Sequence, residues 1–237
     1  MMQRNVRQLA TEQYDILVIG GGITGSCIAH DAALRGLSVA LVEKNDFGAC
    51  TSSASSKLLH GGIRYLPKAQ FHKVRESARE QMIFQHLAPH LTRWLPFLIP
   101  TDKSALTKGK AAMKVAMLVY GLCCAGLSSL IRDPGKQPPP REFLSSAEVL
   151  KKIPMLSAIE KLTGAQILLE SHMHSSERMT LAFVKTAVKN GAHVANYVQA
   201  GQLLVEGKRV AGVRAKDCLN GEEFSIRARI VINSAGP

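Results

Sequence analysis

The sequence predicts an α/β fold in which a parallel sheet and a β-meander are interrupted by a largely helical segment. Three observations predict it. Residues 14–43 have the pattern of strand, glycine turn, helix and strand, and residues 201–228 alternate short apolar runs with turn residues. The apolar run 230–233 then predicts one more buried strand. The residues between these parts, 66–175, carry mainly helical patterns and form the interruption.

The glycine turn is the most informative feature. It runs from Gly20 to Gly25 and matches G-x-G-x-x-G, in which Gly20 permits a tight turn, Gly22 lets the backbone approach a pyrophosphate, and Gly25 lets the helix pack closely. The helix N-terminus then offers free N–H groups to phosphates. Glu43 lies 18 residues after Gly25, where a carboxylate accepts hydrogen bonds from ribose hydroxyls and repels the 2′-phosphate of NADP. The context favours nucleotide binding over a merely structural glycine turn.

The other elements follow from periodicity and from helix end signals. Apolar residues at three- and four-residue steps predict helices at 71–87 and 176–189. Ser145 and Glu148 form the pattern of a capping box, which predicts the start of a short helix. A strand or extended segment is expected at 94–100 and a strand at 192–198.

A serine-rich stretch lies between the first helix–strand unit and the helical segment. It runs from Thr51 to Lys57 and leads into an apolar segment that holds His60, Gly61, Gly62 and Arg64. Composition alone is compatible with a flexible linker. Linkers rarely contain such a segment, however, and hydroxyl and N–H groups beside a lysine suit an anion-binding loop. Both interpretations remain open on the residues alone.

The net charge of +12 is unevenly placed along the 237 residues. Residues 57–161 contain 17 Lys or Arg and 7 Asp or Glu, which leaves +10 in this segment. Such a segment suits an anionic substrate or an anionic membrane surface. Nucleic acid is disfavoured because no recognised nucleic-acid motif accompanies the charge. A solvated basic face without a partner is the remaining alternative.

Several function classes find little support in the sequence. The five cysteines have no metal-ligand spacing, and a reduced, cytosolic compartment is expected. His172 and His174 flank one residue but lack further ligands, so no metal site is predicted. Residues 1–13 are polar and basic without the apolar core of a secretory signal. The uncharged stretch 115–131 is at the lower limit for a membrane span, which favours a buried or interface-lying helix.

The chain resembles the FAD-dependent glycerol-3-phosphate dehydrogenases, within the D-amino-acid-oxidase-like flavoproteins. Four segments carry the resemblance: the glycine turn at 19–25, the serine–lysine–histidine–glycine–arginine block at 51–66, Leu-Ala-Pro-His-Leu at 87–91 and Val-Ile-Asn-Ser-Ala-Gly-Pro at 231–237. The first motif is common to many flavoproteins, and the second is far more specific. Together they follow the family's N-terminal half over nearly the whole chain.

The resemblance implies a Rossmann-like FAD-binding domain at 14–65 and 176–237, a substrate-facing cap at 66–175 and a tail at 1–13. FAD is then the expected cofactor and NAD the weaker choice. The residues expected to bind it are Gly20, Gly22, Ile23, Thr24, Gly25, Glu43, Lys44, Thr51, Ser52, Ser55, Ser56, Lys57, Leu59, His60, Gly61, Gly62, Ala235 and Gly236. A solvated loop is the alternative for Ser56 and Lys57.

The resemblance also implies an activity. The expected reaction is oxidation of sn-glycerol 3-phosphate to dihydroxyacetone phosphate, with electrons passed to quinone. The enzyme would be peripheral at the inner face of the cytoplasmic membrane, with a possible homodimer in a full-length form. A related flavin oxidase or dehydrogenase of a 2-hydroxy or 2-amino acid is the alternative.

Two residues are the catalytic candidates. His60 would take the hydroxyl proton, since imidazole acts as a base at neutral pH, or it would only pack against the flavin loop. Arg64 would pair with the substrate phosphate, with charge on the reduced flavin, or with a carboxylate that fixes the loop.

Two departures weaken the substrate assignment. The family has Glu-His after Arg-Tyr-Leu where this chain has Pro67-Lys68, and a Val-Asp-Asp-x-Arg-Leu type sequence where this chain has residues 174–179. Family enzymes are also about twice as long. The chain is therefore expected to be an N-terminal fragment that is a poor or inactive enzyme, rather than a complete small flavoprotein.

Overall fold

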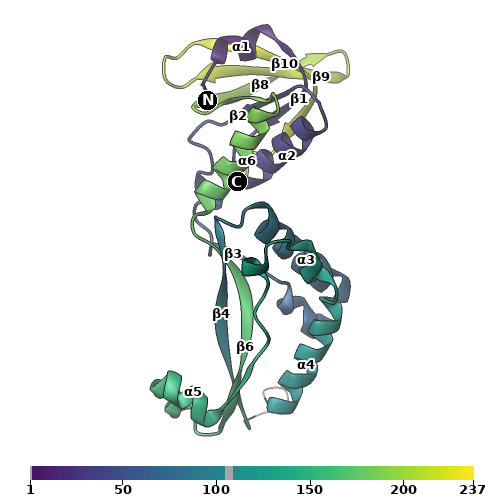
Figure 1. Cartoon of the computed structure of the whole chain (residues 1–237). Helices are drawn as coiled ribbons and strands as arrows, with labels where there is room; N and C mark the ends of the chain where they lie inside the picture. The colour runs from purple at the N-terminus through teal and green to yellow at the C-terminus, as the bar shows by residue number, and fades with distance from the viewer. Residues whose placement is uncertain (1, 105–108) are drawn as a thin grey trace. The chain divides into compact units, whose positions relative to one another are not determined.

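The computed structural model describes residues 2–104 and 109–237, and these form two compact units (Figure 1). The first unit comprises Met1–Ser56 and Ser175–Pro237, and the second comprises Lys57–His174. The second unit is thus one continuous stretch inserted into the first. The sequence predicted boundaries at 65/66 and 175/176, whereas the chain passes between the two units at 56/57 and 174/175. Residues 57–65 therefore belong to the second unit and Ser175 to the first.

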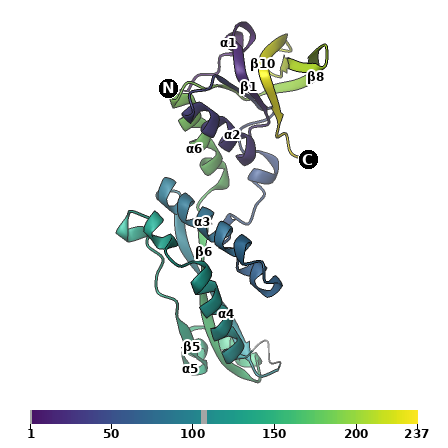
Figure 2. The ribbon, with the colours of Figure 1, turned by 90° about the vertical axis from the view of Figure 1, so that its right-hand side faces the viewer.

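The first unit contains a six-stranded sheet in the order β7-β2-β1-β10-β9-β8. Strands β7, β2, β1 and β10 are parallel, and β9 and β8 continue the sheet as antiparallel strands. Figure 2 shows the strands of this unit together with the helices α2 and α6. The elements of the unit are α1 (Val6–Thr11), β1 (Gln13–Ile19), α2 (Ile23–Leu34), β2 (Val39–Val42), α6 (Ser176–Lys189), β7 (His193–Ala195), β8 (Val198–Glu206), β9 (Arg209–Asp217) and β10 (Glu223–Asn233).

Strand β10 joins the meander to the parallel strands. The sequence predicted separate strands at 222–228 and 230–233, but one strand covers both. Its first half pairs antiparallel with β9 up to Arg227, and its second half pairs parallel with β1, with Leu17 opposite Val231. The prediction that 16–19 and 230–233 belong to one sheet is confirmed, and the structure shows in addition that they are neighbours in it.

Apolar clusters lie on both faces of this sheet. On one face Val18, Val39 and Leu41 are fully buried against α2 and α6. On the other, Leu17 and Val42 pack with residues of α1 and of the meander strands. Continuous apolar β-branched runs are what a strand buried on both faces requires.

The N-terminal residues, predicted to be a tail, contain the helix α1 and pack against the rest of the first unit. Asn5 caps α1 by accepting a hydrogen bond from the Gln8 N–H, and Leu9 is fully buried. The Arg4 guanidinium donates to Asp217 Oδ1 at 2.6 Å. No sequence pattern predicted this helix, because it is short and mostly polar.

The second unit is built on an antiparallel sheet in the order β3-β6-β4, with β5 also paired to β6. Its two long strands run side by side along most of the unit (Figure 1). The helical character expected for 66–175 is present in helices α3, α4 and α5, but the antiparallel sheet was not predicted. The elements are β3 (Leu58–Leu59), α3 (Phe71–Leu87), β4 (Thr92–Asp102), α4 (Lys110–Cys123), β5 (Phe143–Ser145), α5 (Ser146–Lys152) and β6 (Leu162–Met173), with a 3-10 turn at Ile63–Lys68.

Helices α3 and α4 cover one face of this sheet. Val74 and Ala78 of α3 are fully buried, and Met117 and Tyr120 of α4 pack with Leu168 of β6. The capping box predicted at Ser145 and Glu148 is present at the start of α5. The opposite side of α4 leaves large apolar side chains in solvent. Within the described residues, no helix is both long and apolar enough to cross a membrane.

Candidate functional site

The glycine turn forms the edge of a cavity in the first unit. Gly20 has φ +102°, and a Cβ there would collide with the backbone of Ser234. A Cβ on Gly25 would collide with the Gly20 carbonyl oxygen. At Gly22, by contrast, an added Cβ would meet only Ser52 Oγ, at 3.1 Å. Gly20 and Gly25 are therefore required by close backbone packing, whereas Gly22 keeps the cavity open.

The cavity lies beside the N-terminus of α2 and has a volume of about 210 Å³. No side chain caps that helix at Gly22, so its first turn keeps N–H groups for an anion. Ser52 Oγ accepts one of them, the Ile23 N–H, at 2.9 Å. Nine of the predicted cofactor residues line this cavity: Gly22, Ile23, Thr24, Glu43, Lys44, Thr51, Ser52, Ala235 and Gly236.

Glu43 is held rigidly at the end of β2. Its Oε2 accepts the Gly21 N–H at 2.7 Å, and its Oε1 accepts the Asn45 N–H at 2.8 Å. Each carboxylate oxygen keeps a second lone pair for a ribose hydroxyl. Glu43 and Lys44 also line an adjoining cavity of about 210 Å³ that contains Gly20 and Ala235. The two cavities share Glu43, Lys44 and Ala235 as lining residues.

Sequence reasoning missed several residues of these cavities. Asn45, Ala49, Cys50 and Ser234 line the first, and residues 198–200 line the second. Ser234 lies inside a motif already recognised, so its position contained a usable signal. Residues 198–200 come from the start of β8, where the Val198 N–H donates to the Glu43 carbonyl at 2.8 Å, a contact that no local pattern contains. Ser55 and Ser56 are exposed and line neither cavity.

The other predicted residues form a loop in the second unit. Strand β3 pairs with β6, which places Leu58 opposite His172 and Leu59 opposite Ser171. Lys57 precedes the strand with φ +57°, and its carbonyl accepts the Met173 N–H at 2.7 Å. The chain then passes through His60 and the two glycines. These residues belong to a structured loop rather than to a flexible linker.

A buried polar network holds the backbone of this loop. Gln81 Nε2 donates to the Leu59 carbonyl at 2.6 Å, and the Tyr120 hydroxyl donates to the Gly61 carbonyl at 3.0 Å. The Gly61 N–H donates to Glu170 Oε2 at 2.9 Å, and that oxygen also accepts Gln81 Nε2 at 3.1 Å. A Cβ on Gly61 would collide with the Tyr120 hydroxyl, which explains the glycine. Sequence reasoning found none of these three supporting side chains.

The network changes the acidity of its members. Burial raises the pKa of the Glu170 carboxyl, while the Gly61 amide and the His60 ring oppose that rise. Burial also raises the pKa of the Tyr120 hydroxyl, so this group remains a hydrogen-bond donor at any physiological pH. The carbonyl of Gly61 is therefore held by a permanent donor.

His60 and Arg64 lie on the exposed side of the loop. The His60 side chain is 43% exposed, and its Nδ1 faces Glu170 Oε2 at 3.9 Å. The Arg64 guanidinium lies 4.9 Å from the Tyr65 ring centroid and donates to the Tyr65 hydroxyl at 3.0 Å. In the described part of the chain Arg64 makes no salt bridge, so the loop-fixing ion pair considered above is absent.

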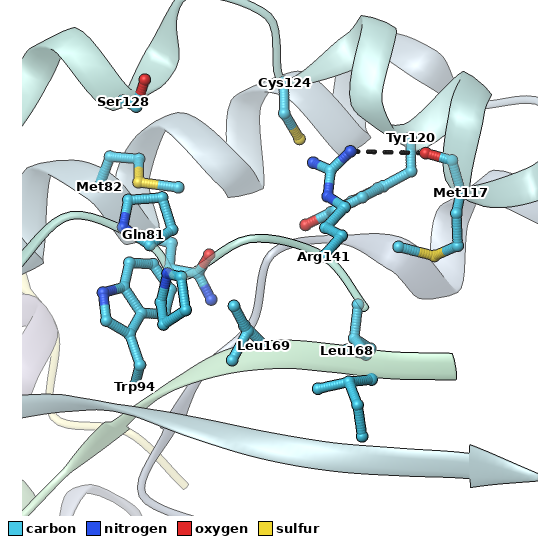
Figure 3. Close-up of a pocket in the computed structure, with 13 residues that line it drawn as sticks. Gln81, Met82, Trp94, Met117, Tyr120, Cys124, Ser128, Arg141, Leu168 and Leu169 are labelled. Carbon is cyan, nitrogen blue, oxygen red and sulfur yellow. Dashed lines mark hydrogen bonds between the residues drawn. The ribbon is translucent and has the colours of Figure 1, made fainter. Parts of the chain in front are cut away.

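A further cavity, of about 190 Å³, lies behind this loop between α3, α4 and β6 (Figure 3). Its wall is mainly apolar, with Trp94, Met82 and Leu168 among the lining residues. Arg141 lies over the Tyr120 ring and donates to the Met117 carbonyl. Within the described residues there is no group of three or more metal-ligating side chains here or elsewhere.

Comparisons with known proteins agree with this geometry. The bovine mitochondrial glycerol-3-phosphate dehydrogenase is 42% identical over 96% of this chain, which corresponds to 31% of its own length. The α-glycerophosphate oxidase of Streptococcus pneumoniae is 37% identical over 98% of this chain and 37% of its own. The chain thus spans about a third of the length of these relatives.

A solved structure and a family model give the same assignment. The glycerol-3-phosphate dehydrogenase of Bacillus halodurans, solved in complex with FAD, has a TM-score of 0.69 and 32% identity over 97% of this chain and 36% of that one. The model of the FAD dependent oxidoreductase family matches residues 15–237. The strand–glycine–helix unit, its open Gly22 and the cavity beside α2 fit the nucleotide half of that cofactor. The chain belongs to the FAD-dependent oxidoreductase family.

Proposed function

We propose that the protein oxidises sn-glycerol 3-phosphate to dihydroxyacetone phosphate, with FAD as the acceptor of the hydride from C2. The observation that carries this proposal is the loop at 57–66. It combines the most specific motif of the sequence with an exposed histidine and an exposed arginine on a rigidly supported backbone. The identity of 42% to the bovine dehydrogenase over 96% of the chain supports it.

The exposed faces of His60 and Arg64 suit the two polar ends of such a substrate. His60 is the proposed base for the C2 hydroxyl proton, because its Nε2 lies on the side of the ring away from Glu170. Arg64 is the proposed partner of the phosphate. Its stacking on Tyr65 restricts the guanidinium, which lowers the entropy lost when it binds an anion.

Substrate reduction of the flavin tests the proposal. The protein containing this chain is loaded with FAD and mixed anaerobically with sn-glycerol 3-phosphate, with glycerol, or with a 2-hydroxy or 2-amino acid. Loss of the visible flavin absorption is expected with the phosphorylated substrate and much more slowly with glycerol. Faster reduction by an unphosphorylated 2-hydroxy or 2-amino acid would establish the rival function.

Quinone is the proposed electron acceptor. One relative is named a dehydrogenase and another an oxidase, so oxygen is the competing acceptor. Stopped-flow reoxidation of the reduced protein by a short-chain ubiquinone and by oxygen separates the two. We expect quinone to reoxidise it faster, and a faster reaction with oxygen would assign the chain to the oxidase type.

We also propose that the protein is peripheral at the inner face of the cytoplasmic membrane and that α4 contacts the lipid. Val115, Leu118 and Leu122 are 61%, 65% and 68% exposed and lie on one side of this helix. Lys110 and Lys114 precede them on the same helix and are exposed, with their Nζ atoms 4.8 and 5.8 Å from the centroid of the Phe143 ring. Exposed apolar residues flanked by lysines suit the interface of an anionic bilayer, where the lysine head groups meet lipid phosphates.

Vesicle sedimentation tests this surface. Leu118→Glu combined with Leu122→Glu is expected to weaken binding to vesicles of mixed phosphatidylglycerol and phosphatidylcholine by at least about tenfold. Leu219→Glu is the matched control, because Leu219 is 64% exposed and lies in the other unit. Equal binding by the double variant and the parent would remove α4 from the proposal.

The proposed activity is that of a longer protein that contains this chain, because the chain corresponds to about a third of its relatives' length. Residues 1–237 alone are proposed to be a poor enzyme. A site that lacks part of its enclosing protein admits water, and losing one preorganised group costs about 10²–10³ in rate. Rapid glycerol-3-phosphate turnover by residues 1–237 would contradict this.

A further inference from the structure

Among the described residues, Glu170 is the carboxylate that contacts the loop of His60. It lies on β6 and is 6% exposed, in a strand whose neighbouring residues are mostly apolar or buried. A carboxylate at such a position carries a desolvation cost, which a neutral side chain of similar shape would avoid.

The polar contacts of this carboxylate with described residues converge on a single oxygen. Oε2 accepts the Gly61 N–H at 2.9 Å and Gln81 Nε2 at 3.1 Å, and it lies 3.9 Å from His60 Nδ1. The first two contacts fix the backbone that carries the imidazole. The third exceeds hydrogen-bond distance, but it is short for a charge interaction, and such contacts commonly tighten when substrate binds.

The orientation of the imidazole follows from this arrangement. With Nδ1 facing the buried carboxylate, Nε2 is on the opposite side of the ring, and the side chain is 43% exposed. A carboxylate facing Nδ1 favours the tautomer in which Nδ1 carries the proton, which leaves Nε2 unprotonated. It also stabilises the positive charge that the ring acquires when Nε2 accepts a proton.

We infer that Glu170 is a positioning residue for His60: it holds the Gly61 peptide, directs Nδ1 inward, and offsets the imidazolium charge formed when Nε2 takes the substrate's hydroxyl proton. The inference rests on the proposed function for the identity of the substrate. The geometry that it uses lies entirely within the second unit. Neither Gln81 nor Tyr120 supplies the charge, since both are neutral donors to the same loop.

Glu170→Gln isolates the charge, because an amide oxygen can still accept the Gly61 N–H and the Gln81 amide. In the FAD-loaded protein we expect flavin reduction by sn-glycerol 3-phosphate to slow by about 10- to 100-fold, with KM changed less than about threefold. Ser171→Ala is the matched control. Ser171 is the next residue of β6, is fully buried, and its hydroxyl accepts Gln85 Nε2 at 2.8 Å, while its backbone pairs with Leu59.

A second readout does not depend on turnover. The ¹⁵N shifts of the His60 ring report its tautomer, and we expect the Nδ1–H form in the parent and a mixture in Glu170→Leu. Should the parent fail to be reduced by glycerol 3-phosphate, the proposed function falls, and the tautomer still decides the role of Glu170.

Three results would overturn the inference. One is an unchanged reduction rate in Glu170→Gln. Another is an equal loss of rate in Ser171→Ala, which would indicate general loosening of the sheet. The third is the same His60 tautomer in Glu170→Leu as in the parent. If Glu170→Leu does not fold, the rate comparison of Glu170→Gln with Ser171→Ala decides alone.

Discussion

His60 is the residue whose replacement tests the chemistry most directly. His60→Gln retains a hydrogen-bonding side chain but removes the base. The rate of flavin reduction by substrate is expected to fall by about 10²–10⁴-fold, because general-base catalysis contributes this much. FAD content is expected to stay unchanged, since the loop backbone is held by Gln81, Tyr120 and Glu170. A variant that loses FAD and keeps its rate per bound flavin would show that His60 only packs against the loop.

Arg64 is expected to act on binding rather than on the chemical step. A charge-assisted hydrogen bond contributes about 1.5–3 kcal/mol, so Arg64→Met should raise the KM for glycerol 3-phosphate by roughly 10- to 150-fold. Arg79→Met is the control, because Arg79 is exposed on α3 and its salt bridge within the described residues is to the adjacent Glu80. Steady-state kinetics of the two variants measure the difference. A fall in kcat at unchanged KM would instead place Arg64 near the flavin.

Sequence patterns predicted the residues that face the site better than those that support it. The glycines and Glu43 follow a motif whose spacing reflects the geometry of a nucleotide. Glu170, Gln81 and Tyr120 come from a strand and two helices that are distant in sequence from the loop. None of the three belongs to a sequence motif that would mark it as part of the site. Only the pairing of β3 with β6 brings Glu170 to the loop.

At the scale of the element, substitution by alanine should have different effects at the second and third glycines of the motif, Gly22 and Gly25. Gly22→Ala places its Cβ 3.1 Å from Ser52 Oγ and into the cavity. We expect near-normal stability with FAD affinity at least about tenfold weaker, measured by flavin titration. Gly25→Ala collides with the Gly20 carbonyl and is expected to lower the melting temperature of the apoprotein itself. Equal effects of the two substitutions on stability would contradict this division.

Amphipathic helices were predicted most accurately among the elements. The structure gives α3 and α6 the predicted bounds, because each shows apolar periodicity between clear end signals. Strand β6 received no prediction. Three consecutive polar residues, Glu170, Ser171 and His172, lie near the end of this twelve-residue strand. They interrupt the alternation of apolar and polar residues by which a strand is recognised. Burial of these polar residues depends on β3 and β4 on either side, which a local pattern does not contain.

At the scale of the whole molecule, the ion pair of Arg4 and Asp217 ties the N-terminal segment to the meander. The Arg4 hydrogen bond lowers the pKa of the Asp217 carboxyl. A lowered folded-state pKa contributes stability above the unfolded value, about 3.9, and that contribution is lost as pH falls through the folded value. Asp217→Asn should therefore be about 1 kcal/mol or more less stable than the parent at pH 7, with the difference closing below about pH 4.

Denaturant unfolding at several pH values measures this difference. Asp31→Asn is the matched control, since Asp31 also pairs with an arginine, but its side chain is 63% exposed where that of Asp217 is 5% exposed. An exposed pair contributes little, so this control should stay close to the parent at every pH. Equal losses in the two variants would mean that burial of the Arg4 pair adds nothing.

The position of β10 has a consequence for biosynthesis. This strand is synthesised after the other strands of its sheet, yet it lies in the middle of that sheet between β1 and β9. During synthesis, β1 therefore keeps one unpaired apolar edge while more than two hundred residues are added after it. The inserted unit is one continuous stretch, so it can complete its own sheet while the nucleotide-binding unit is still open. The nascent chain thus exposes an edge strand until β10 has been made, and this edge is where chaperones would have to act.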